Sequence, residues 1–230
     1  MTGEKSTEIF AASPVAQDYL KLIWTAQTRG KDGLSINELA RRTGVVASTA
    51  SENVRRLVAQ GLIDHTPYQK ARLTSKGRSV AVGMIRRHRI LETYLHEVLN
   101  FDWDEVHEEA EILEHAISDR LLGRLEAALK YPSRDPHGDP IPAADGTCEV
   151  LPETILLSEL TEGQEAILIR VSDRDSEAMR ANDALGITLG TRVRMMRVLS
   201  EDSGFIVKIG DRESVLTYRQ AQILHVSADA

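Results

Sequence analysis

The sequence predicts a mainly α-helical chain with a β-rich C-terminal part: a winged helix-turn-helix, a helical domain and a small β-barrel. Apolar residues recur at helical spacing near the N-terminus, and histidines and glutamates stand one helical turn apart in the middle. Later, short β-rich runs alternate with Gly, Asp and Ser. The 230 residues, 42% of them hydrophobic, suffice for two or three modest domains. The expected parts are a winged helix-turn-helix over 1–76, a helical domain over 77–142, a linker over 143–156 and a barrel over 157–230.

Two helices are expected at the start of the chain. Apolar residues at helical spacing predict the first from about Pro14 to Arg29. Ser35 and Glu38 fit a capping box, in which the hydroxyl and the carboxylate satisfy free amides at the start of a second helix. The residues expected to face the core are Tyr19, Leu20, Ile23, Trp24, Leu39 and Ala40.

A third helix and a wing complete the winged helix-turn-helix. The run 48–52 is expected to cap and open the helix, which should end at Ala59, before Gly61. Val54, Leu57 and Val58 should face the core. The residue types over 62–74 predict two short strands around a turn.

The third helix has the composition of a DNA-recognition element, with small hydroxyl side chains first and arginines further along. Residues 1–90 carry 15 Lys and Arg against 7 Asp and Glu, whereas residues 91–230 carry 13 against 28. Glu52 disfavours phosphate, so it should accept from a cytosine amine or point away. The candidate DNA-contacting residues are Ser48, Thr49, Ser51, Glu52, Arg55, Arg56, Lys70 and Arg72. The alternative is a three-helix core without a DNA role, with ordinary solvated charges.

Two long amphipathic helices are expected in the middle of the chain, one from Gly77 to about Asn100 and one from Trp103 to about Tyr131. Both have apolar stripes outside the DNA-binding core. Such stripes are natural dimer-forming surfaces, and a homodimer would suit a palindromic operator in double-stranded DNA.

The same helices carry candidate metal ligands. His88 and Glu92 share one helical face by their i, i+4 spacing, and a second face is expected to hold His107, Glu111, Glu114 and His115. Imidazole and carboxylate donors suit manganese, ferrous iron or zinc. His107 and His115 should lie about 12 Å apart along the axis, too far for one ion, so two sites are expected. Surface ion pairs are the alternative for each His-x-x-x-Glu pair taken alone.

The order of these features resembles the diphtheria toxin repressor family: a winged helix, His88-x-x-x-Glu92, then His107-x-x-x-Glu111-x-x-Glu114-His115. The resemblance covers nearly the whole chain, including a proline-rich hinge over 131–142. It implies a dimeric, divalent-metal-activated repressor of metal uptake or storage genes. It also implies two sites per subunit, with His88, Glu92 and His107 in one. The other would hold Glu111, Glu114 and His115, with Asp18 as a ligand from the first helix.

The resemblance also addresses which metal is sensed. Iron-responsive members carry a methionine and a cysteine where this chain has Asp18 and Glu111, whereas manganese-responsive members carry these acids. Hard oxygen donors suit Mn²⁺, so two Mn²⁺ ions per subunit are expected, with Fe²⁺ as the alternative. One position departs from the pattern, since some manganese members have a glutamate where this chain has Lys21.

The last part of the chain predicts a small barrel. Strands are expected over 166–171, 192–198, 205–209 and 214–218, with a short helix over 177–185. The part resembles the SH3-like (FeoA-like) module of longer family members, where acidic side chains reach the first metal site. Asp173, Asp175 or Glu177 would do so here, and Asp175 is our choice.

Two other classes stay open at this point. A metallohydrolase would use similar residues, although its metal keeps an open position in a pocket. A metal-independent winged-helix regulator would bind DNA equally well in chelator. The sequence favours a repressor over an enzyme. It has no apolar run of the roughly 20 residues that span a bilayer and no basic start followed by an apolar core, so we expect a cytoplasmic protein without a membrane partner.

Overall fold

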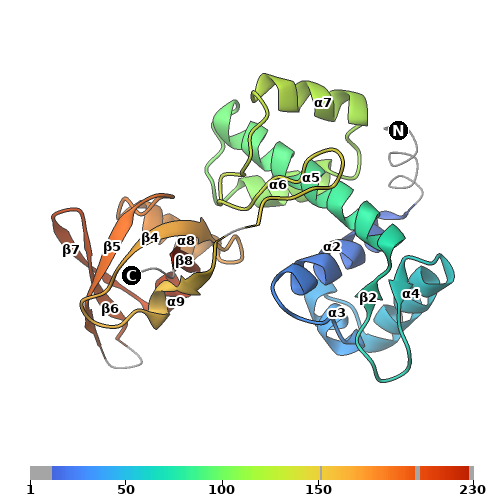
Figure 1. The fold of residues 1–230 in the computed structure, drawn as a ribbon, viewed down its shortest axis with the longest axis horizontal. Coiled ribbons are helices and arrows are strands. Elements are labelled where there is room, and N and C mark those ends of the chain that lie inside the picture. The colour runs from blue at the N-terminus through green and yellow to red at the C-terminus, as the bar shows by residue number, and fades with distance from the viewer. Residues whose placement is uncertain (1–11, 151, 200–202, 228–230) are drawn as a thin grey trace. The chain divides into compact units, whose positions relative to one another are not determined.

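The computed structural model describes residues 12–150, 152–199 and 203–227 (Figure 1). They form two compact units. Of the described residues, one unit contains 12–88, 113–123 and 142–148, and the other contains 89–112, 124–141 and those from 149 to 227. Within the described residues, no helix combines the length and apolar character needed to cross a membrane.

The first unit contains the expected winged helix-turn-helix (Figure 1). Helix α2 begins after Ser13, whose hydroxyl accepts from the amide of Ala16, and buries Tyr19, Leu20 and Ile23 completely. Its elements are α2 (Pro14–Thr28), α3 (Ile36–Thr43), α4 (Ala47–Ala59) and the antiparallel wing strands β1 (Ile63–Asp64) and β2 (Arg72–Leu73).

The capping box at Ser35 is confirmed. The amide of Glu38 donates to the Ser35 hydroxyl at 3.2 Å, and the Glu38 carboxylate accepts from the Ser35 amide at 2.9 Å. Gly44 ends α3 in the left-handed region, at φ 68°. A left-handed residue suits glycine because it has no Cβ to clash.

Two details of α4 differ from the sequence expectation. The helix begins at Ala47, and its N-cap is Val46, which provides no capping side chain, so the Ser48 hydroxyl is not the cap. Val58 is 38% exposed rather than buried, because Val54 and Leu57 already fill the side of α4 that faces the core.

The middle of the chain contains three helices where two were expected: α5 (Ser75–Glu97), α6 (Val106–Leu113) and α7 (Asp119–Ala128). The expected helix from Trp103 to Tyr131 is wrong, because the chain turns after Leu113. The amides of Ala116 and Ile117 both donate to the carbonyl of Leu113, and the Ser118 hydroxyl accepts from the amide of Leu121 to start α7. Glu114 and His115 therefore lie in a turn, not on one helical face with His107.

The proline-rich segment expected to be a hinge is tied into the second unit. A carboxylate oxygen of Asp135 accepts from the amides of His137 and Asp139, both at 2.9 Å. The carbonyl of His137 accepts from the amide of Val171 at the end of β4 (Glu165–Val171). These bonds hold the segment in one conformation beside the C-terminal sheet.

The C-terminal part of the second unit is a six-stranded antiparallel sheet in the order β3-β8-β4-β5-β6-β7. All four expected strands are present. Two strands were missed: β3 at one edge and β8 beside it. β3 lies in residues expected to be linker. The remaining elements are β3 (Thr154–Leu156), η1 (Leu157–Glu159), α8 (Ser176–Asp183), β5 (Arg192–Val198), β6 (Phe205–Ile209), β7 (Arg212–Leu216), α9 (Tyr218–Ala221) and β8 (Leu224–Ser227).

Candidate metal centre and DNA-binding surface

A first group of candidate ligands lies in the first unit. It joins Asp18 of α2 to Glu114 and His115 of the turn after α6, with one ligand atom from each within 4.8 Å of the others. Nε2 of His115 lies 3.2 Å from Oδ1 of Asp18 and 3.7 Å from Oε1 of Glu114. The turn that breaks the expected helix thus brings Glu114 and His115 to α2.

Gln17 orients the imidazole of this group. Nδ1 of His115 lies 2.7 Å from the side-chain oxygen of Gln17, which can only accept, so Nδ1 is the protonated nitrogen. Nε2 then faces the two carboxylates. A histidine that donates its other N–H in this way is oriented for metal binding. Sequence analysis missed Gln17, which is 3% exposed, because nothing in local spacing distinguishes a buried glutamine with such a role.

Lys21 lies beside the same group. Its ammonium donates to Oε1 of Glu114 at 2.5 Å, and the two side chains are 11% and 0% exposed. The second carboxylate oxygen of Glu114 accepts from Nδ1 of His88 at 2.7 Å. The buried carboxylate of Glu114 therefore pairs with Lys21, at the position where some manganese-responsive family members have a glutamate.

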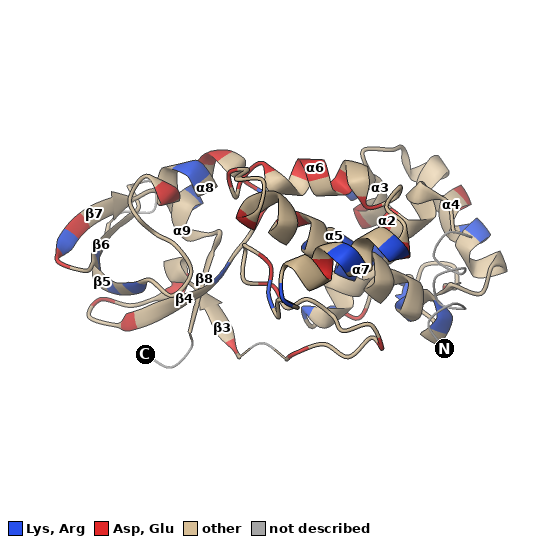
Figure 2. Ribbon diagram, turned by 90° about the horizontal axis from the view of Figure 1, so that it is seen from above, with Lys and Arg blue, Asp and Glu red and all other residues tan. Residues whose placement is uncertain are grey.

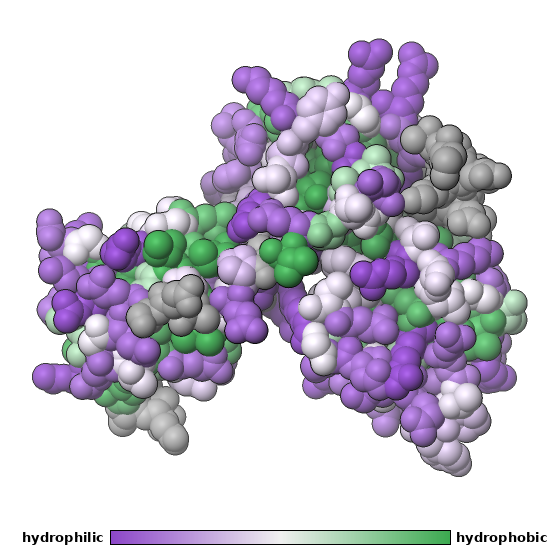
Figure 3. All heavy atoms as spheres, viewed as in Figure 1, coloured by the Kyte–Doolittle hydropathy of each residue, from purple (hydrophilic) through white to green (hydrophobic). Residues whose placement is uncertain are grey.

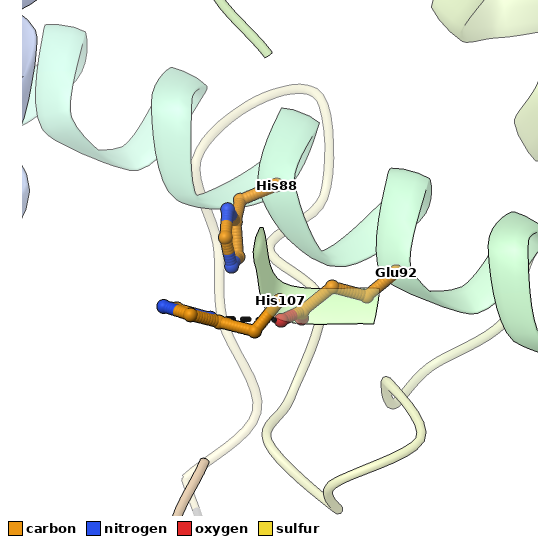
Figure 4. A group of neighbouring side chains, drawn as sticks. All are labelled: His88, Glu92 and His107. Atoms are coloured by element: carbon orange, nitrogen blue, oxygen red, sulfur yellow. Dashed lines mark hydrogen bonds and ion pairs between the residues drawn. The ribbon is translucent and has the colours of Figure 1, made fainter. Parts of the chain in front are cut away.

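A second group contains His88, Glu92 and His107 (Figure 4). His88 and Glu92 project from successive turns of α5, and His107 comes from α6. Because Nδ1 of His88 donates to Glu114, Nε2 of His88 is the nitrogen available to this group. Nδ1 of His107 lies 3.3 Å from Oε1 of Glu92.

His107 also meets an acid of the C-terminal part, Asp173, at 3.1 Å from Nδ1. Burial disfavours the charged imidazole, but hydrogen bonds with Asp173 and Glu92 outweigh it and raise the pKa of His107 to about 10. Burial would raise the pKa of Asp173, but the bond from His107 lowers it below its usual value. Without a metal, the two groups thus form an ion pair.

Asp175, the chosen C-terminal ligand, does not join either group. Its carboxylate caps α8 by accepting from the amide of Ala178, and it pairs with Arg219. Among the three acids considered, Asp173 reaches His107, while Glu177 also pairs with Arg219. The physical reason is that a helix N-cap and a guanidinium already hold Asp175.

Glu111 offers a further carboxylate near members of these groups. One of its carboxylate atoms is within 4.8 Å of ligand atoms of His88 and Glu114, and Oε1 is 3.9 Å from Nε2 of His107. The donors of all these groups are imidazole nitrogens and carboxylate oxygens, which suit a hard or borderline divalent cation. The residues present therefore fit such an ion.

The candidate DNA-contacting surface is exposed. In α4, Ser48, Thr49, Glu52, Arg55 and Arg56 are exposed and Ser51 is half-buried. On the wing, Lys70 and Arg72 are exposed, and Arg72 pairs with Asp32. Glu52 pairs with Arg55 at 2.9 Å, so its charge is compensated within the helix. Figure 2 shows basic residues on α4, whereas α6 carries acidic residues and no basic ones.

Several large apolar side chains of the middle segment are exposed. Ile112 is 69% exposed, Leu121 50% and Leu99 52%. Figure 3 shows apolar residues among hydrophilic ones on one face of the molecule. Exposed apolar patches are typical of protein interfaces.

Comparisons with known proteins match the chain in three consecutive segments. Residues 12–71 match "Iron dependent repressor, N-terminal DNA binding domain", 74–143 match "Iron dependent repressor, metal binding and dimerisation domain", and 155–228 match "FeoA domain". The diphtheria toxin repressor of Corynebacterium efficiens is 30% identical over 207 residues, which cover 84% of this chain and 89% of that protein. The chain belongs to the diphtheria toxin repressor family.

This member of the diphtheria toxin repressor family is a metal-dependent transcriptional repressor and not an enzyme. The metallohydrolase and the metal-independent regulator are thereby set aside. The iron-dependent repressor of Mycobacterium leprae is 31% identical over 159 residues, which cover 66% of this chain and 69% of that protein.

Solved structures resemble this repressor over nearly its whole length. One, titled "Manganese-dependent transcriptional repressor complex with manganese", has a TM-score of 0.85 and 45% identity, covering 92% of this chain and 99% of that chain. The manganese regulator SloR has a TM-score of 0.72 and 29% identity, covering 92% and 97%. Iron and manganese are thus both named among the relatives.

Proposed function

We propose that this repressor is activated by Mn²⁺, binds two ions per chain and acts as a homodimer on a palindromic operator of metal-homeostasis genes. The observation that carries the proposal is the grouping of Asp18, from the DNA-binding segment, with Glu114 and His115. Asp18 and Glu111 supply hard oxygen donors, which Mn²⁺ prefers to softer ligands. The manganese-bound relative at 45% identity agrees with this choice.

Asp18 explains how an ion would control DNA binding. It lies on α2, which packs in the same core as α4, the candidate recognition helix. An ion held by Asp18, Glu114 and His115 would fix α2 against the turn after α6. Because metal binds the ordered arrangement better, it would shift the population towards the conformation that binds DNA.

The second group would hold the other ion. His88, Glu92 and His107 supply two imidazoles and a buried carboxylate, and Asp173 adds a carboxylate from the C-terminal part. An ion there would replace the proton that holds His107 and Asp173 together. This site is expected to couple metal binding to the order of the second unit.

The deciding experiment is DNA binding by the purified protein at fixed salt, with DNA from upstream of its own gene and of nearby metal-transporter genes. We expect tight binding with Mn²⁺, weaker binding with Fe²⁺ under anaerobic conditions and little in chelator. Asp18→Asn should weaken Mn²⁺-dependent binding by about 10-fold or more, whereas Asp183→Asn, an exposed change on α8, should not.

Other outcomes of this experiment would contradict particular parts of the proposal. Binding that ignores metal would contradict metal activation by these groups. A response to Fe²⁺ at concentrations where Mn²⁺ has no effect would make the protein an iron sensor, like the iron-dependent repressor of Mycobacterium leprae. If Asp18→Asn left Mn²⁺-dependent DNA binding unchanged, α2 would not contribute a ligand to the metal site.

A further inference from the structure

Tyr68 is an exposed aromatic residue at the tip of the wing, in the loop between β1 and β2, for which sequence analysis found no role. Its side chain is 104% exposed, the highest value among the large hydrophobic side chains of the described residues. A tyrosine stabilises a fold mainly by burying its ring. The exposed ring of Tyr68 therefore contributes nothing of this kind to the stability of the wing.

The backbone of Tyr68 is also unusual. Its φ is 66°, in the left-handed region, where the Cβ of any residue other than glycine comes too close to a carbonyl oxygen. The amide of Gln69 donates to the carbonyl of Thr66 at 3.0 Å and closes a turn whose two central residues are Pro67 and Tyr68. Proline favours the first of these positions, but a positive φ at the second favours glycine or asparagine. Tyr68 thus costs the folded protein free energy, and strain of this kind is concentrated at functional sites.

The wing holds this residue beside the candidate recognition helix. Strand β1 packs against α4, and the amide of Leu62 donates to the carbonyl of Leu57 in the last turn of α4 at 3.0 Å. Next to β2, Ala71 exchanges two backbone hydrogen bonds with Leu34, at 2.8 and 3.2 Å. The base of the wing is therefore fixed to the rest of the first unit, and α4 and the tip of the wing approach a DNA duplex together.

The charge at the tip of the wing suits the DNA backbone. Residues 65–71 include exposed Lys70 and no acid, although exposed Asp64 precedes them. Tyrosine hydroxyls are among the groups that donate to DNA phosphates. We propose that Tyr68 contacts the sugar–phosphate backbone of DNA beside the groove that α4 enters, with its ring against a deoxyribose and its hydroxyl donating to a phosphate. The inference rests on DNA binding in the proposed function, and it adds an uncharged contact from the wing.

The test is DNA affinity measured together with stability in the full-length protein. Tyr68→Gly removes the side chain and relieves the backbone, so it should raise the urea midpoint of unfolding while it weakens DNA binding by about 10-fold. Binding is measured with Mn²⁺, on DNA from upstream of the protein's own gene and on a random-sequence duplex of equal length. Both duplexes should lose affinity by the same factor, because contacts to the DNA backbone carry no sequence information.

Tyr131→Gly is the matched control. Tyr131 also has a positive φ, of 60°, and its side chain is 70% exposed, but it belongs to the second unit. The control should raise the urea midpoint without changing DNA affinity. A loss of affinity in Tyr68→Gly alone would therefore come from the wing and not from the change of a strained tyrosine to glycine.

Two further measurements identify the kind of contact. Tyr68→Phe should keep part of the affinity, because its ring still covers the sugar although the hydroxyl is lost. The salt dependence of binding by Tyr68→Gly should equal that of the wild type, because a neutral side chain displaces no counterion. Lys70→Ala should instead lower the slope by about 1.

Unchanged DNA affinity in Tyr68→Gly would overturn the inference, and so would a lowered urea midpoint, which would make Tyr68 a structural residue of the wing. A loss of affinity confined to the upstream DNA would overturn the assignment to the DNA backbone. If DNA binding by the wild type ignores Mn²⁺, the proposed metal activation fails, but binding to the random-sequence duplex still decides the role of Tyr68.

Discussion

At the scale of residues, the donors decide which cation the repressor can bind. Asp18 and Glu114 give the first group two carboxylates, and Glu111 adds an oxygen donor near His88 and Glu114. The imidazole of His115 is oriented by its bond to Gln17. The charge of the buried Glu114 carboxylate is a second factor at this scale. Glu114 is fully buried and meets Lys21 and His88 in the absence of an ion.

Softer ligands should change the metal response. The double variant Asp18→Met with Glu111→Cys should shift activation from Mn²⁺ towards Fe²⁺, because thioether and thiolate donors favour the softer, later ion. The measurement is operator binding against metal concentration, anaerobically, for both ions. An unchanged preference would contradict the hardness argument.

Lys21 should matter most without metal. Lys21→Met leaves Glu114 buried with one fewer positive partner, and we expect a loss of about 3 kcal/mol in the free energy of unfolding in chelator. Saturating Mn²⁺ should reduce the loss, since the ion replaces the lysine charge. Urea unfolding measures both values, and Lys76→Met, at an exposed lysine of α5, is the control. Equal losses in the free energy of unfolding with and without Mn²⁺ would contradict the expectation that the ion takes the place of Lys21 beside Glu114.

At the scale of elements, two features stand out: a close backbone approach at the start of α5, and the turn that interrupts the expected long helix. The start of α5 passes the chain before the wing so closely that a Cβ on Gly77 would lie 1.9 Å from the carbonyl oxygen of Leu62. The turn between α6 and α7 moves Glu114 and His115 off the helix that carries His107.

Two helical glycines should respond in opposite directions. Gly77→Ala should destabilise the protein by about 1–3 kcal/mol, because backbone must move to admit the methyl group. Gly123→Ala in α7 should stabilise it by about 0.5–1 kcal/mol, because its Cβ would meet nothing within 4 Å and alanine favours helix. Thermal or urea unfolding checks both; a harmless Gly77→Ala would mean that α5 can shift away from the wing.

At the scale of the whole molecule, the stability of the metal-free protein should depend on pH. The pKa of His107 is raised from about 6.5 in an unfolded chain to about 10. Its stabilising contribution is therefore complete below pH 6.5 and is lost as pH rises through about 10. The lowered pKa of Asp173 adds a contribution that is present above about pH 4 and is lost as pH falls.

The resulting prediction concerns thermal stability in chelator. The melting temperature should fall as pH rises from about 6.5 to about 10, and His107→Gln should flatten this part of the profile. Mn²⁺ should offset the fall, because the metal binds deprotonated imidazole. Parallel profiles for wild type and His107→Gln would show that the pair with Asp173 does not contribute.

The sequence by itself determined the local structure and the class of protein. Helical spacing predicted α2 and α5, and the Ser35 capping box set the start of α3. Short β-rich runs separated by Gly, Asp and Ser predicted four of the six C-terminal strands. Spacing along α5 also placed His88 and Glu92 together. These features depend on residues a few positions apart, which is the range over which periodicity and capping act.

Only the tertiary structure decided which distant groups meet. It brought Asp18 to His115, chose Asp173 over Asp175 beside His107, and buried His137 near Glu92. It also broke the expected long helix at Glu114. Such contacts follow from competition for partners across the fold, as when Ala178 and Arg219 hold Asp175, and no local pattern records that competition.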